Sequence, residues 1–211
     1  MIAHALTIVR NELESHLSVI SPHGMAGHAH TELGNVAEVG TGQGGDGTTR
    51  DRVVLSMVNI QEERALRNAP CVTGENPPTF LNFAVLVAAT HADYPAALIA
   101  LSRTVTFFQH RNLFTRDNVD PASLTTGAPP NPIDQLVEFK LIITLGSPSF
   151  EEVNDMWGML GGKQFPFALY WMRMLELKFQ SNPMEPATVT EIVRRYETKD
   201  PRSTEARPLQ H

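Results

Sequence analysis

One stretch, residues 137–177, constrains the fold more than any other part of this 211-residue chain. It begins with apolar side chains at every second position from Val137 to Leu145, a pattern typical of a strand with one buried face. It ends in residues 167–177, a second strand pattern whose two faces are both largely apolar. Because apolar faces need a covering layer, we expect this second strand to be buried on both sides.

A short helix is expected between these two strands. Ser149 and Glu152 fit a capping box, in which each side chain accepts a hydrogen bond from the backbone N–H of the other residue. Ser147 followed by Pro148 is an alternative helix start. The pair Gly161–Gly162 should end the helix, because glycine tolerates the left-handed conformation needed there. Apolar side chains at spacings of 3, 4 and 3 mark the buried helical face: Phe150, Val153, Trp157 and Leu160.

The rest of the chain predicts two more helices and two more strands. Residues 2–20 carry an apolar stripe at helical spacing, and a second helix is expected from Pro95 to Phe108. Residues 52–60 and 79–90 are mostly apolar and indicate strands. Together these patterns favour an α/β (α+β) fold, with a small four-stranded, mainly antiparallel or mixed sheet flanked by helices.

Three segments lack such patterns. Residues 21–50 are rich in glycine and histidine and are expected to form a flexible insertion in a domain spanning 1–178. Residues 117–132 predict a proline-rich loop without internal structure. Residues 179–211 form a polar tail that is either disordered or an arm that becomes ordered on a partner.

The overall charge excludes some classes of function. The formal net charge is −6 and the isoelectric point about 5.7, whereas nucleic-acid-binding domains are normally basic. Cys71 is the only cysteine, which fits a reducing compartment and allows no intrachain disulfide. The N-terminus lacks a basic region and a cleavage site, and the longest apolar run is far shorter than the ~20 residues that cross a bilayer. We therefore expect folding in the cytoplasm, without membrane insertion and without nucleic acid as a partner.

No catalytic signature is present. Gly40, Gly42 and Gly45 match G-x-G-x-x-G, but no strand precedes them and no apolar helix follows, so a dinucleotide site is not expected. The best residual catalytic candidates follow secondary-structure elements and have no nucleophile beside them: His91, Asp93 and His110. We expect neither enzymatic activity nor a cofactor.

Histidines in the glycine-rich segment suggest the main alternative hypothesis. A metal- or ligand-binding regulatory domain could use this loop, with His23, His28 and His30 meeting His16 or Glu32. No cysteine and no rigid scaffold support such a site, and histidines in glycine-rich loops are more often solvated. Stoichiometric metal that is lost when the loop histidines are changed to alanine would favour this alternative.

Four strings carry a family resemblance that covers roughly residues 1–178. The most specific are L-S-x-V-N-I-x-E-E-x-x-L-R-N within residues 53–68 and W-G-x-L-G-G-K within 149–175, in that order. Residues 77–91 and 94–115 lie between them and carry the other two strings. Together they resemble the N-terminal domain of the tail-terminator, or cap, protein of phage-tail-like extracellular contractile injection systems. The insertion at 22–50 and the tail after residue 178 are not part of this pattern.

The resemblance implies a structural protein with a terminator-like sheet and flanking helices. Such proteins form a six-fold ring at the tail end distal to the baseplate, and stop polymerisation of the inner tube and sheath. The implied partners are other copies of the chain, the sheath protein and the inner-tube protein, in a particle that assembles in the cytoplasm and can be released. Extended arms of sheath subunits would join the sheet by strand addition.

Two regions are the candidate contact surfaces, at 59–68 and at the 157–163 turn. The charged side chains of the first are either a solvated face or an electrostatic contact with a partner. The expected interface residues are Asn59, Glu62, Glu63, Arg64, Arg67, Trp157, Gly161, Gly162 and Lys163.

Overall fold

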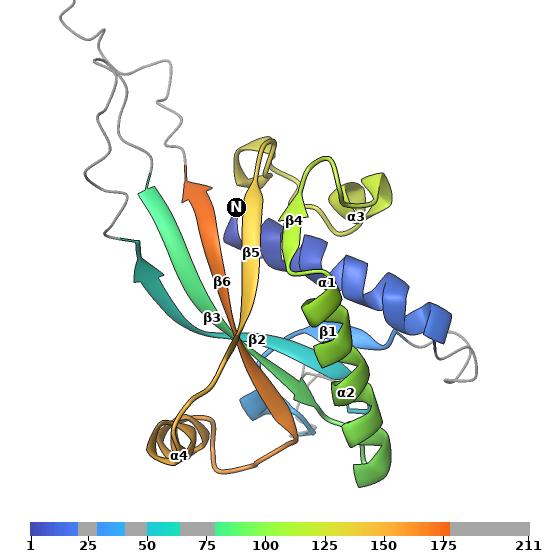
Figure 1. Ribbon diagram of the computed structural model, residues 1–211, viewed down its shortest axis with the longest axis vertical. Helices are drawn as coiled ribbons and strands as arrows, with labels where there is room; N and C mark the ends of the chain where they lie inside the picture. Colours follow the sequence, from blue (N-terminus) through green and yellow to red (C-terminus); the bar gives the residue numbers. More distant parts are fainter. Residues whose placement is uncertain (21–28, 41–49, 64–78, 178–211) are drawn as a thin grey trace, which may run out of the picture. The chain divides into compact units, whose positions relative to one another are not determined.

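The computed structural model describes residues 1–20, 29–40, 50–63 and 79–177 (Figure 1). Its strands are β1 (Thr31–Leu33), β2 (Val53–Glu62), β3 (Thr79–Ala89), β4 (Leu113–Thr115), β5 (Lys140–Gly146) and β6 (Phe167–Leu177). Its α-helices are α1 (Ile2–Ile20), α2 (Tyr94–His110), α3 (Pro121–Thr125) and α4 (Phe150–Met159). Two 3₁₀ helices, η1 (Val36–Glu38) and η3 (Pro132–Asp134), complete the elements.

The strands form one sheet in the order β1-β2-β3-β6-β5-β4. β1 pairs with β2 in parallel, and every other neighbouring pair is antiparallel. The sheet is therefore mixed and mainly antiparallel, as expected, but the expected count of four strands is wrong. The two additional strands, β1 and β4, lie at the sheet edges and have three residues each, which is too short to show an alternating pattern.

The two faces of the sheet carry different hydrophobic layers. α1 and α2 cover one face, where Leu13 and Phe107 pack in one cluster with Val85 and Tyr170 of the sheet (Figure 1). α4 lies on the opposite face, and its Trp157 packs in a smaller cluster with sheet residues. β6 contributes to both clusters, but Leu169 and Trp171 on the α4 side are only partly buried, so the expected cover of this strand is incomplete on that face.

The capping box expected for α4 is present. Ser149 Oγ accepts from the N–H of Glu152 at 3.3 Å, and the Glu152 carboxylate accepts from the N–H of Ser149 at 2.7 Å. Gly161 and Gly162 follow the helix with φ values of 86° and 76°, in the left-handed region that favours glycine. The sequence therefore placed both ends of this helix correctly.

The segment expected to be a loop at 117–132 contains helical structure. The Asp120 side chain accepts from the N–H of Ala122, and Pro121 occupies the first position of α3. Asn131 and Pro132 begin η3 in the same way. An Asp or Asn followed by proline is an N-cap followed by a favoured first helical residue, so these prolines start helical turns.

Two other boundaries differ from those expected. The strand predicted from Val137 begins at Lys140, where pairing with β4 starts, and Val137 itself is exposed. Within residues 21–50, Thr31–Leu33 forms β1 and Val36–Glu38 forms η1. Both differences arise from contacts with partners distant in sequence, which local patterns do not report.

Candidate interaction surfaces

The outer half of β2 presents an open strand edge. β1 pairs with β2 only at Val53–Leu55, and the last contact is the Gly34 N–H donating to the Leu55 carbonyl at 3.2 Å. From Met57 to Glu62, β3 is the only strand that pairs with β2 in the described part of the chain. We call residues 57–62 the open β2 edge. Unpaired strand edges readily add a further strand.

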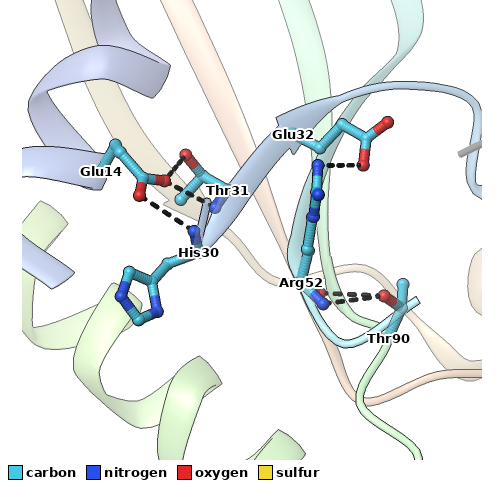
Figure 2. Close-up of polar contacts among 6 residues, drawn as sticks. All are labelled: Glu14, His30, Thr31, Glu32, Arg52 and Thr90. Atoms are coloured by element: carbon cyan, nitrogen blue, oxygen red, sulfur yellow. Dashed lines mark hydrogen bonds and ion pairs between the residues drawn. The ribbon is translucent and has the colours of Figure 1, made fainter. Parts of the chain in front are cut away.

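The position of β1 determines where this open edge begins. The Glu14 carboxylate on α1 accepts hydrogen bonds from the N–H of His30 at 2.9 Å and the N–H of Thr31 at 2.7 Å (Figure 2). It also accepts from Thr31 Oγ1 at 2.6 Å. One side chain of α1 therefore satisfies the backbone donors at the start of β1 and fixes that strand beside Val53.

A second set of contacts supports the inner half of β2. Arg52 Nη1, on the residue just before β2, forms an ion pair with Glu32 Oε2 of β1 at 3.1 Å (Figure 2). The Arg52 N–H donates to Thr90 Oγ1, and that hydroxyl donates to the Arg52 carbonyl at 3.0 Å. Contacts on both sides of β2 therefore hold its first residues, whereas its outer half has contacts on one side.

The expected interface residues of the first region fall on this outer half. Asn59 and Glu62 are exposed on β2. Just after the strand, the Glu63 N–H donates to the Phe80 carbonyl at 2.9 Å, and its carboxylate accepts from Asn82 Nδ2 at 2.7 Å. Glu63 therefore has a structural role at the end of the β2–β3 pair. Arg64 and Arg67 lie outside the described residues.

The second expected region combines a buried residue with an exposed turn. Trp157 is 5% exposed and packs edge-to-face against Phe167, with ring centroids 5.3 Å apart. Its indole N–H is buried and has no hydrogen-bond partner among the described residues. Gly161, Gly162 and Lys163 are exposed immediately after α4. Trp157 thus anchors the helix within this chain, and the turn beside it is the accessible part.

A groove that the sequence did not predict lies between α4 and the sheet. Its larger section has a volume of about 490 Å³ and continues into a section of about 460 Å³ that shares the side chains of Val58, Met156 and Met159. We call it the α4 groove. Its floor is formed by Val58, Ala84, Leu169 and Trp171, and its wall by Met156 and Met159. The sequence signal was present, since β6 is apolar on both faces and the helix between β5 and β6 is short.

The histidines of the alternative hypothesis do not form a metal site where they are described. No group of three His, Cys, Asp or Glu side chains in residues 1–20, 29–40, 50–63 and 79–177 is arranged to hold a metal ion. His16 instead packs against Phe107, with ring centroids 4.9 Å apart and the ring planes tilted by 39°. His30 lines a pocket with His91, and His23 and His28 lie outside the described residues.

The three residues that were the best catalytic candidates, His91, Asp93 and His110, lie in different surroundings. The Asp93 side chain accepts from the N–H of Ala96 and caps α2. Burial lowers the pKa of His91; the Asp51 carboxylate opposes this effect and the neighbouring His30 adds to it. These surroundings together favour the neutral form of the His91 imidazole. His110 is exposed in the last turn of α2.

Comparisons with known proteins place the chain in a family. The family model of the Pvc16 N-terminal domain matches residues 4–191. The chain belongs to this family, which confirms the tail-terminator family expected from the sequence strings. No curated protein matches the chain. Among the described residues, no helix combines the length and hydrophobicity needed to span a bilayer.

Two solved structures show weak likeness to this chain. One is the sheath/tube terminator of an extracellular contractile injection system, PVC, in its extended state, with a TM-score of 0.47 and 11% identity. The other is the tube-terminating cap of the anti-feeding prophage, with a TM-score of 0.41 and 13% identity. They cover 90% and 69% of this chain, which spans 63% and 49% of their respective lengths. Likenesses this weak assign neither a partner nor an activity to this chain.

Proposed function

We propose that this protein is a structural tail terminator of a contractile injection system. Copies of the chain form a ring at the tail end distal to the baseplate. The ring contacts the last subunits of inner tube and sheath and stops both from polymerising further. The observation that carries this proposal is the family match across residues 4–191, which includes every described element apart from the first two residues of α1.

The open β2 edge supports a contact by strand addition. The Glu63 N–H donates to the Phe80 carbonyl, so these two residues form a hydrogen-bonded antiparallel pair. Because such pairs alternate along a ladder, the N–H groups of Glu62 and Ile60 point away from β3. Both groups are available to the backbone of an incoming strand, and an extended arm of a sheath subunit is the proposed source.

The exposed turn at 161–163 is the proposed second contact. Trp157 holds α4 against the sheet, so the turn that follows has a defined position. Lys163 adds a positive charge beside a helix that carries three carboxylates and no cation. Charges at the rim of an interface guide register and association rate more than affinity.

Tail length provides the first test. Inner tube and sheath proteins of the same particle are assembled with and without this protein, and tail lengths are measured in negative-stain images. We expect capped tails of limited length with the protein and longer, uncapped tails without it. An unchanged length distribution, together with no co-sedimentation of the protein with tails, would overturn the proposal.

Glu62→Pro tests the strand-addition contact. Proline removes the outward N–H of residue 62 without removing a bond to β3, which is the position where edge strands tolerate proline. Glu62→Ala is the matched control, since it removes the carboxylate and retains the N–H. Sheath binding should fall at least tenfold for Glu62→Pro relative to Glu62→Ala. Equal binding by the two variants would exclude the open β2 edge as the contact.

A further inference from the structure

We propose that the α4 groove is the binding site for helix α2 of a second copy of this chain. This helix-in-groove contact joins neighbouring subunits. The inference deepens the proposed terminator function and rests on it for the existence of a ring. It assigns the two surfaces that meet. One is the α4 groove, and the other is an exposed apolar stripe on α2.

The groove is a part of the sheet that lacks its covering layer. α4 covers only one end of its sheet face, where Met156 and Trp157 pack against Val54 and Leu86. Beside the helix, the partly exposed Trp171 and Leu169 form an apolar floor. An apolar sheet face is normally buried against another element of structure. A helix laid next to α4 would complete that layer.

α2 carries apolar side chains that this chain does not bury. Tyr94 is 63% exposed, Leu98 42% and Ile99 52%, and the spacing of four between Tyr94 and Leu98 places them one turn apart on the helix. Ile99 follows Leu98 directly and lies about 100° further around the helix, on the adjacent side. We call these three residues the α2 stripe. The opposite side of the helix packs in the main core through Phe107 and Phe108. The stripe is therefore available to a partner while α2 remains fixed to its own sheet.

The charges of the two surfaces are complementary. α4 contains Glu151, Glu152 and Asp155, all exposed, and no basic residue. α2 contains no acidic residue and carries one positive charge, that of Arg103. Arg103 lies four residues after Ile99, on the same side of the helix. Opposite charges on the flanks favour the docking of α2 beside α4 and oppose the docking of α4 against another α4.

The two surfaces lie on opposite faces of the sheet, which determines the kind of assembly. α2 packs on one face and α4 on the other (Figure 1). A contact between different patches of two identical chains is heterologous, and each copy retains one free groove and one free stripe. Such contacts continue from copy to copy until a ring closes. A symmetric dimer that leaves no free surface is not expected.

Disulfide trapping between two single-cysteine variants tests the contact. In a Cys71→Ser background, Leu98→Cys places a thiol on the α2 stripe and Met159→Cys, at a position 80% exposed, places one on the groove wall. The two purified variants are mixed with the inner-tube protein, oxidised, and analysed by non-reducing electrophoresis. We expect a cross-linked heterodimer at least tenfold more abundant than either homodimer. Val137→Cys, at an exposed position outside both surfaces, replaces Leu98→Cys as the control and should give no cross-link above background.

A charge-matched pair of variants provides an independent measurement. Leu98→Lys and Leu98→Glu remove the same apolar side chain and introduce opposite charges. Because the groove is flanked by carboxylates, self-association measured by light scattering should be at least tenfold weaker for Leu98→Glu than for Leu98→Lys. Equal association of the two, or trapping of homodimers instead of heterodimers, would overturn the inference. If rings form and cap tails but no Leu98–Met159 cross-link is trapped, the α2–α4 contact is refuted and the terminator function still holds. If tails recruit none of the protein, the terminator function itself is refuted.

Discussion

Glu14→Gln should release β1 from the sheet edge while the rest of the fold remains intact. The carboxylate accepts three hydrogen bonds, from the N–H groups of His30 and Thr31 and from Thr31 Oγ1. Hydrogen bonds to a charged group contribute about 1.5–3 kcal/mol each. Glutamine retains one carbonyl oxygen and turns an NH₂ group toward the remaining donors. We therefore expect the free energy that holds β1 in place to fall by about 2–4 kcal/mol.

Amide hydrogen exchange measures this change where it occurs. The Val53 N–H donates to the His30 carbonyl at 2.8 Å, and the Thr31 N–H donates to Glu14, so both amides report on the attachment of β1. A loss of 2–4 kcal/mol corresponds to roughly 30- to 1000-fold faster exchange, since about 1.4 kcal/mol is a factor of ten. Amides in the centre of β3 should be unaffected, because β1 contributes one edge of the sheet.

Glu32→Gln is the matched control. It makes the same chemical change on β1 but affects a partly exposed ion pair with Arg52, which should contribute less than about 1 kcal/mol. If Glu14→Gln changed the exchange of the Thr31 and Val53 amides by less than threefold, Glu14 would not be what holds β1. If β3 exchanged faster by the same factor as β1, the effect would be global destabilisation.

The remaining predictions concern stability. Trp157→Ala should cost about 3–5 kcal/mol in chemical denaturation and unfold the domain, because it removes the aromatic side chain of the α4 cluster; a variant as stable as wild type would show that Trp157 does not anchor α4. Glu12→Ala should cost about 2–4 kcal/mol, since the carboxylate is 4% exposed and pairs with Arg111 and the Asp120 N–H; denaturation within 1 kcal/mol of wild type would contradict this. Burial raises the pKa of Tyr170 to about 12, so the unfolded chain ionises first, and stability should fall by up to about 3 kcal/mol between pH 10 and pH 12. Tyr170→Phe should abolish that alkaline loss in pH-dependent thermal melts.

Elements with long or strongly marked patterns were predicted closely. The apolar stripe of α1, the capping box at Ser149 and the glycines after α4 are all where the sequence placed them. These features depend on residues within one or two turns of each other, so local sequence contains the information that determines them. The alternation of β6 indicated correctly that apolar side chains lie on both of its faces, but the face beside α4 is only partly covered.

The candidate surfaces were predicted only in part. Asn59 and Glu62 were expected at an interface, and they lie on the open β2 edge; their contact with a partner stays a prediction. The sequence could not indicate that this edge is open, because the short strand β1 pairs only as far as Leu55 and its start is held by α1, which is distant in sequence. Trp157 was selected together with the exposed turn, but it is buried against Phe167.

The sequence by itself determined the family, the main helices and the long central strands, because motif strings and periodicity are properties of neighbouring residues. The tertiary structure alone decided the edges of the sheet and the space between its layers. Glu14 reaches His30 and Thr31 across 16 and 17 residues, and the α4 groove joins side chains from Val58 to Trp171. Open edges and uncovered faces are defined by where packing stops, and that depends on every element that folds around them.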